Sequence, residues 1–75
     1  MFVYKTKIIN SSDGRQYRLV FSKHHDDYVY YVRYYLSKNG RGYGNWKGLG
    51  WYTNISHALR ALKKRLKGCL LTVIG

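Results

Sequence analysis

The pattern of apolar and polar residues predicts three β-strands in the first half of the chain. The runs Phe2–Ile9, Gln16–Lys23 and Tyr28–Ser37 are rich in β-branched and aromatic residues, which suit a pleated strand. An Asp-Gly pair separates the first two runs, the polar segment His24–Asp27 separates the next two, and an Asn-Gly pair follows the third. Because Asp-Gly and Asn-Gly favour tight hairpin turns, the three strands are expected to form an antiparallel meander.

The second half of the chain predicts an irregular fourth strand and then a helix. Tyr43–Thr53 combines strand-forming aromatic residues with glycines, which indicates a bulged strand. Apolar residues over Ile55–Leu66 recur at helical spacing, and basic residues gather at the C-terminal end, where the helix dipole favours them. Asn54 or Ser56 is the expected N-cap, and Gly68 is the expected stop.

These elements predict a single α+β domain over residues 1–75. We expect an antiparallel three- to four-stranded β-meander with one amphipathic C-terminal helix packed on one face. Leu70–Ile74 is expected to form a short final strand or a packed tail. With a single helix available, the second face of the sheet stays open unless a partner covers it.

The tyrosine-rich third strand is expected to divide its side chains between these two faces, because successive residues of a strand point to opposite sides. Tyr28, Tyr30 and Tyr34 are expected in the core, under the helix. The residues expected on the open face are Arg18, Tyr31, Arg33 and Tyr35, with Lys5 and Lys7 added if the first strand joins in the assumed register. A register slip of one residue would exchange the two faces.

The charge balance points to a polyanionic partner. The chain has 14 Lys and Arg against three acidic residues, which gives a net charge of +11. Such an excess is typical of proteins that bind nucleic acid, an anionic membrane or an acidic protein surface. Rings interleaved with cations on an open sheet face are suited to stacking bases and holding phosphates. The alternative is that tyrosine is simply well tolerated in strands and that the basic surface is solvated.

Two further basic segments are candidates for the same contacts. Lys38–Lys47 is expected to be a hairpin loop in which glycines permit close approach of a ligand. Within it, the residues expected to reach phosphates or to stack on bases are Lys38, Arg41, Tyr43, Trp46 and Lys47. The helix adds Lys64 and its neighbours Arg60, Lys63 and Lys67. A flexible hairpin and an ordinary solvated helix are the alternatives.

No constellation in the sequence indicates catalysis, a metal or a cofactor. The segment His24–Asp27 has ligand-type residues, but neighbours on an extended chain point apart, so a turn is expected. Cys69 is the only cysteine, which excludes an internal disulfide and fits a small buried residue in a reducing compartment. We therefore expect a cytoplasmic protein that is not an enzyme, has no cofactor and does not bind a membrane.

A family resemblance supports the DNA-binding interpretation. The segments 50–53 (Gly-Trp-Tyr-Thr) and 56–59 (Ser-His-Ala-Leu), following three strands, resemble the small three-stranded DNA-binding domains of phage and transposon integrases, and plant ethylene-response domains are similar. In those families the open sheet face enters the DNA major groove. The contacts that the resemblance implies here are Arg18, Tyr31, Arg33, Tyr35 and Lys47.

The chain also resembles small early proteins of bacteriophages, some of which inhibit host defences such as CRISPR nucleases. The sequence thus predicts a phage-encoded nucleic-acid-binding protein whose target is single-stranded or duplex DNA or RNA. The alternative is an inhibitor that docks its basic surface on an acidic patch of a host defence complex.

Overall fold

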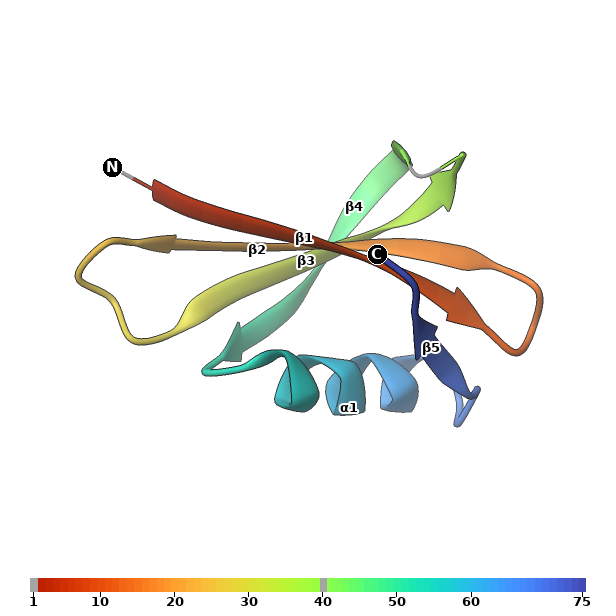
Figure 1. Cartoon of the computed structure of the whole chain (residues 1–75). Coiled ribbons are helices and arrows are strands. Elements are labelled where there is room, and N and C mark those ends of the chain that lie inside the picture. Colours follow the sequence, from red (N-terminus) through yellow and green to blue (C-terminus); the bar gives the residue numbers. More distant parts are fainter. Residues whose placement is uncertain (1, 40) are drawn as a thin grey trace.

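The chain folds as a five-stranded antiparallel sheet with one helix, which confirms the α+β prediction (Figure 1). This computed structural model describes residues 2–39 and 41–75, with residues 42 and 43 described through their backbone alone. The elements along the chain are β1 (Phe2–Ser11), β2 (Gln16–His24), β3 (Tyr30–Lys38), β4 (Arg41–Tyr52), α1 (Ile55–Arg65) and β5 (Leu71–Val73).

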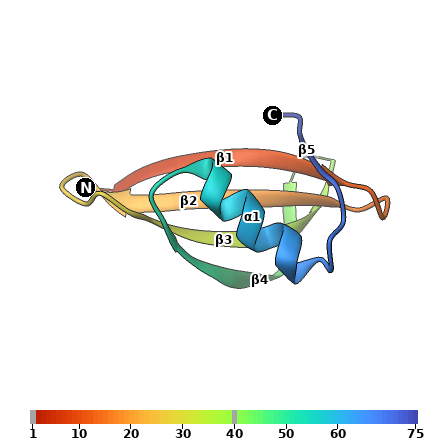
Figure 2. The same ribbon diagram turned by 90° about the horizontal axis from the view of Figure 1, so that it is seen from below.

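The strands lie in the order β4-β3-β2-β1-β5, so the meander is extended at its first strand by the C-terminal segment. The helix α1 runs diagonally across one face of this sheet (Figure 2). After α1 the chain returns to pair β5 with β1, where Ile9 lies opposite Val73. The predicted final strand is therefore present, and it forms the edge of the sheet opposite to β4.

The turns follow the predicted chemistry. Gly14, between β1 and β2, has a φ of 88°, a conformation that glycine adopts without steric cost. Next to it the Arg15 backbone N–H donates to Oδ1 of Asp13 at 2.9 Å. This hydrogen bond holds the pKa of Asp13 below its ordinary value. Between β3 and β4, Asn39 has a φ of 55°, the left-handed conformation that a tight hairpin turn uses.

The helix begins at the first of its two predicted caps. The side chain of Asn54 accepts a hydrogen bond from the backbone N–H of His57 at 3.1 Å, which satisfies one of the free donors of the first turn. The last turn carries Lys63, Lys64 and Arg65. Beyond the C-cap Leu66, Lys67 takes the left-handed conformation with a φ of 57°, and the N–H of Gly68 donates to the carbonyl of Lys63 at 2.9 Å. The helix therefore ends one residue before the stop that was predicted at Gly68.

The core fills the space between α1 and the sheet. Ala58 and Leu62 of the helix are fully buried against the strands. The strand residues that complete the buried cluster are Ile9, Tyr17, Leu19, Phe21, Val32, Tyr34 and Leu49. Tyr30 packs against the edge of this cluster, so two of the three tyrosines that were expected in the core contribute to it.

Tyr28 does not contribute to the core, so the core prediction for this residue is wrong. Its side chain is 91% exposed, because β3 begins only at Tyr30 and the two residues before it belong to the turn after β2. A turn does not continue the alternation of a strand, so the period of two cannot be extended back to Tyr28.

The prediction that Lys5 and Lys7 lie on the open face of the sheet is also wrong. Lys5 lies opposite Phe21 and Lys7 opposite Leu19, and directly opposed residues of antiparallel strands share a face. Phe21 and Leu19 are core residues, so both lysines lie on the helix side of the sheet.

The segment Lys38–Lys47 is a hairpin of two strands and not the expected loop. Lys38 already pairs with Arg41, and the pairing of β3 with β4 continues with two register shifts, between Val32 and Arg33 and between Tyr34 and Leu36. Gly44 has a φ of 80°, a conformation typical of a bulge. Gly44 therefore lies in a bent strand, and the sequence predicted such a strand only from Tyr43 onward.

Candidate functional site

The face of the sheet opposite to α1 has no helix over it and is called the open face. Strand pairing places on it Phe2, Tyr4, Thr6 and Ile8 of β1, Arg18, Val20, Ser22 and His24 of β2, Tyr31, Arg33 and Tyr35 of β3, and Gly48 and Trp51 of β4. The four residues predicted for this face from β2 and β3 are therefore all on it.

An aromatic row crosses the open face from one strand to the next. Tyr4 lies opposite Ser22, Ser22 opposite Tyr31, and Tyr31 opposite Trp51. The rings of Tyr31 and Trp51 lie 5.1 Å apart with an interplanar angle of 53°. Tyr4 and Trp51 are 61% and 63% exposed, so flat apolar surface is available at both ends of the row.

Gly48 gives the Tyr31 ring its place in this row. A Cβ atom at Gly48 would lie 2.6 Å from the Tyr31 hydroxyl and 3.9 Å from Cζ3 of Trp46. A glycine is therefore required for the present position of Tyr31, whose hydroxyl lies over the backbone of β4. The same contacts show that Trp46, which is 49% exposed, also lies on the open face.

Two guanidinium groups lie beside these rings. The guanidinium carbon of Arg33 lies 5.3 Å from the centre of the Trp46 ring, a cation–π arrangement. Arg18 lies opposite Tyr35 and Arg33 opposite Val20, so the two arginines are diagonal neighbours on adjacent strands. The Nε atoms of both arginines are shielded from solvent and have no acceptor among the described residues.

No acidic residue shares the strands or the helix with these groups, because Asp13, Asp26 and Asp27 all lie in turns. Arg18 and Arg33 are thus two close cations without a carboxylate on their own or neighbouring strands. Such a pair is suited to an anionic partner.

The other predicted residues are dispersed over the molecule. Lys38 and Arg41 are exposed at the end of the β3–β4 hairpin. Lys47 lies opposite Tyr34 and therefore on the helix side, away from the open face that the integrase resemblance implied for it. The side chain of Tyr43 lies outside the described residues.

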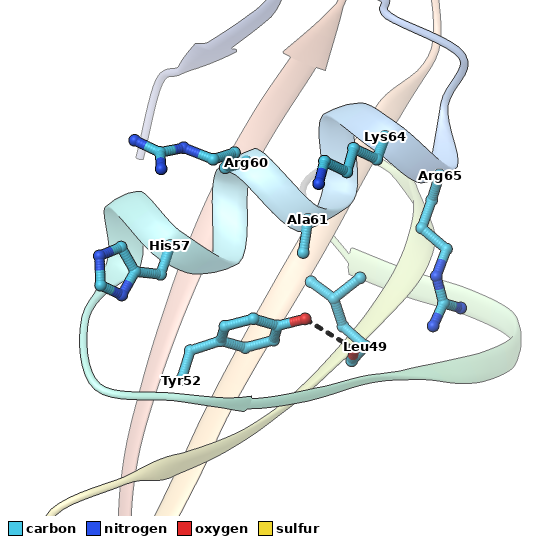
Figure 3. A pocket seen from close by; sticks show the side chains of 7 residues that line it. All are labelled: Leu49, Tyr52, His57, Arg60, Ala61, Lys64 and Arg65. Carbon is cyan, nitrogen blue, oxygen red and sulfur yellow. Dashed lines mark hydrogen bonds between the residues drawn. The ribbon is translucent and has the colours of Figure 1, made fainter.

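Lys64 lies on the helix at a groove between α1 and β4 (Figure 3). Leu49 and Tyr52 of β4 face Ala61 of the helix there, and the Tyr52 hydroxyl donates to the carbonyl of Leu49 at 2.9 Å. The basic residues around this apolar floor are His57, Arg60, Lys64 and Arg65. Arg65 already donates to the carbonyl of Gly48 at 3.3 Å, so the helix end is tied to the edge strand.

Tyr4 and Trp51 were missed as site residues. The signal for Tyr4 was present, because a hairpin that closes with Asn10 opposite Gln16 pairs Tyr4 with Ser22. Counting back from the turn would also have placed Lys7 opposite Leu19. Trp51 was part of the motif that carried the family resemblance, but its position opposite Tyr31 depends on the register shift in β4.

Within residues 2–39 and 41–75, no three His, Cys, Asp or Glu side chains gather where they could hold a metal ion. The helix in the described part of the chain is too short and too polar to cross a membrane.

Comparisons of this chain with protein-family models, curated proteins and solved structures found no match.

Proposed function

We propose that this protein binds nucleic acid and holds a single strand against the open face of its sheet. The observation that carries the proposal is the aromatic row of Tyr4, Tyr31 and Trp51 beside the cations Arg18 and Arg33. Bases stack on exposed rings, and phosphates bind to guanidinium groups, so this arrangement matches both parts of a nucleotide.

The net charge of +11 supports the choice of a polyanion. Lysines and arginines that neutralise phosphates release the counterions of the nucleic acid, and this release supplies much of the affinity. Lys38 and Arg41 at the exposed hairpin end extend the positive surface beyond the open face. The strand would then be held by phosphate contacts and oriented by stacking.

The width of the sheet favours an unpaired strand over a duplex. Four strands, β1 to β4, contribute to the open face, and neighbouring strands lie about 4.8 Å apart, so the backbones of β1 and β4 are separated by roughly 14 Å. The major groove of B-DNA is about 12 Å wide. That groove admits an α-helix or a two-stranded ribbon, whereas this four-stranded face is too wide to enter it flat. Stacking on an unpaired base contributes about 1–3 kcal/mol.

Fluorescence anisotropy with labelled single-stranded and duplex oligonucleotides tests the proposal. We expect tighter binding of the single strand, quenching of tryptophan emission, and an affinity that falls steeply as salt rises from about 50 to 200 mM. An affinity that does not change with salt would contradict the phosphate contacts. Preferential binding of the duplex would contradict the stacking.

Two variants with a matched control locate the binding surface. Trp51→Ala removes an exposed ring of the row and is expected to weaken single-strand binding about 5- to 150-fold, the equivalent of about 1–3 kcal/mol. Arg33→Ala is expected to weaken binding and to flatten the salt dependence. Leu70→Ala removes a side chain that is 69% exposed and lies outside strands β1 to β4, and it is expected to change the affinity less than twofold.

Circular dichroism checks that each variant is folded. Equal loss of binding in Leu70→Ala and Trp51→Ala would mean that the open face is not the binding surface. The resemblance to phage proteins implies a different outcome, an inhibitor of a host defence complex. A protein partner retained after nuclease treatment, together with no binding of any oligonucleotide, would replace the present proposal with that one.

A further inference from the structure

Lys5, Lys7 and Lys23 lie together on the helix side of the sheet. They line a crevice of about 670 Å³ between the sheet and the segment that leads into α1. Its other walls are the aromatic residues Phe21, Tyr28 and Tyr30 and the segment 53–55. We call this site the lysine crevice. It lies on the opposite side of the sheet from the open face.

Two of these lysines converge on one ring. The Nζ atom of Lys23 lies 4.8 Å, and that of Lys5 lies 5.6 Å, from the centre of the Tyr30 ring. A ring face attracts each ammonium group, but it does not neutralise their charges. The two cations are therefore held near each other, with a third, Lys7, on the same wall.

No carboxylate compensates this charge within the crevice. Its lining contains no acidic residue, and Asp26 and Asp27 lie in the neighbouring β2–β3 turn. The helix that begins at the crevice has no acidic residue in its first turn either, so the partial positive charge of its start adds to the field. Three like charges with no counter-charge in the lining repel one another, and a bound anion would relieve this repulsion.

We propose that the lysine crevice is an anion site that binds a phosphate group. Ammonium groups bind phosphate as compact charges with three donors each, and the tyrosine walls provide apolar surface for the group that carries the phosphate. The proposal does not rest on binding at the open face. The groove between α1 and β4 is less suited to this role, because its floor is apolar and Arg65 is already engaged.

The test uses inorganic pyrophosphate and the full chain. Backbone amide resonances of Lys23, Asn54 and Ile55 are expected to shift on titration, while those of Trp46 and Trp51 on the open face stay unchanged. The double variant Lys5→Gln/Lys23→Gln is expected to weaken pyrophosphate binding about tenfold or more, since each charged hydrogen bond contributes on this scale. Lys63→Gln/Lys67→Gln, on the exposed helix end, removes the same net charge and is the matched control.

The midpoint of thermal unfolding, measured with and without pyrophosphate, is a second readout. If the lysines had a purely structural role, pyrophosphate would not shift this midpoint. Without phosphate, Lys5→Gln/Lys23→Gln is expected to melt at a higher temperature than the unmodified chain, because repulsion is removed. Pyrophosphate is expected to raise the midpoint of the unmodified chain and of the control pair, but not of this variant. Equal weakening by both pairs, or a lower midpoint of Lys5→Gln/Lys23→Gln without phosphate, would overturn the site.

An oligonucleotide titration identifies the source of the phosphate. If Lys5→Gln/Lys23→Gln weakens single-strand binding more than the control pair does, the crevice holds a phosphate of the bound strand. If oligonucleotide binding is affected equally by both pairs while pyrophosphate binding is lost in this variant alone, the ligand is a small phosphate compound. Trp51→Ala should leave pyrophosphate binding unchanged. The proposal for the lysine crevice and the proposal for the open face are therefore tested independently.

Discussion

Gly48→Ala is expected to alter the open face through a single contact, the one with the Tyr31 hydroxyl. A Cβ atom at this position would lie 2.6 Å from the Tyr31 hydroxyl, while the next atom of that ring, Cζ, is at an ordinary 3.6 Å. To restore a contact of 3.4 Å, the hydroxyl must move by roughly 0.8 Å. Gly48 does not have a positive φ, unlike Gly44 and Gly50 on the same strand, so its backbone accepts alanine without strain.

The expected consequence is a change in binding with little change in stability. Gly→Ala gains about 0.4–1 kcal/mol by restricting the unfolded chain, and this gain offsets the overpacking, which costs about 1 kcal/mol where a side chain can move. The displaced Tyr31 ring no longer lies in line with Trp51. We expect single-strand affinity to fall about fivefold, close to 1 kcal/mol, the lower limit of one stacking contact.

A double-mutant cycle isolates this mechanism. Tyr31→Phe deletes the hydroxyl and leaves the ring, so Gly48→Ala in that background meets only the atom at 3.6 Å. Anisotropy titrations are expected to show a fivefold loss for Gly48→Ala alone and less than a twofold change when it is added to Tyr31→Phe. The same loss in both backgrounds would refute the argument, because the effect would then not pass through the hydroxyl.

Three further predictions concern stability. Leu62→Ala removes a fully buried side chain and should lower the free energy of unfolding by about 2–5 kcal/mol in a urea titration, a large part of the roughly 4–11 kcal/mol expected for 75 residues. Asn54→Ala should cost about 1 kcal/mol through the lost N-cap, whereas Ser56→Ala, its exposed neighbour, should cost less than half of that; equal costs would exclude Asn54 as the cap. Asp13 forms its hydrogen bond with the Arg15 N–H as a carboxylate with a lowered pKa, so its contribution is present above the ordinary aspartate pKa of about 3.9 and is lost as pH falls through the lowered value. The thermal midpoint of Asp13→Ala should therefore lie below that of the unmodified chain at pH 7 and converge with it in acid, whereas a constant difference would contradict the linkage.

Local chemistry was sufficient to predict most elements of this fold. The strands, the turn at Asp13 and Gly14, and the Asn54 cap all depend on residues within a few positions of each other. Local chemistry failed for Tyr28, whose strand propensity did not reveal that the preceding turn extends to Val29. It also failed for the Lys38–Lys47 hairpin, where glycines indicated a loop although the strand β4 continues through them by bulging.

The candidate sites were less predictable because they form across strands. The sequence predicted that Arg18, Tyr31, Arg33 and Tyr35 share a face, and strand pairing confirms it. Strand alternation alone also divided β1 into two sets, but it did not say which set faces the helix. That choice depends on pairing with β2, which places the lysines of β1 on the helix side and brings Tyr4 to the open face.

The sequence by itself determined the elements, their order and an excess of positive charge, because propensity, capping and composition act within short segments or over the whole chain. Only the tertiary structure decided what the charged and aromatic residues meet. It places the Tyr31 hydroxyl over Gly48, sets Arg33 beside Trp46, and brings Lys5 and Lys23 to one ring. Each of these contacts joins residues on different strands. Because a strand has a period of two, a register shift of one residue would exchange the faces and remove every one of them.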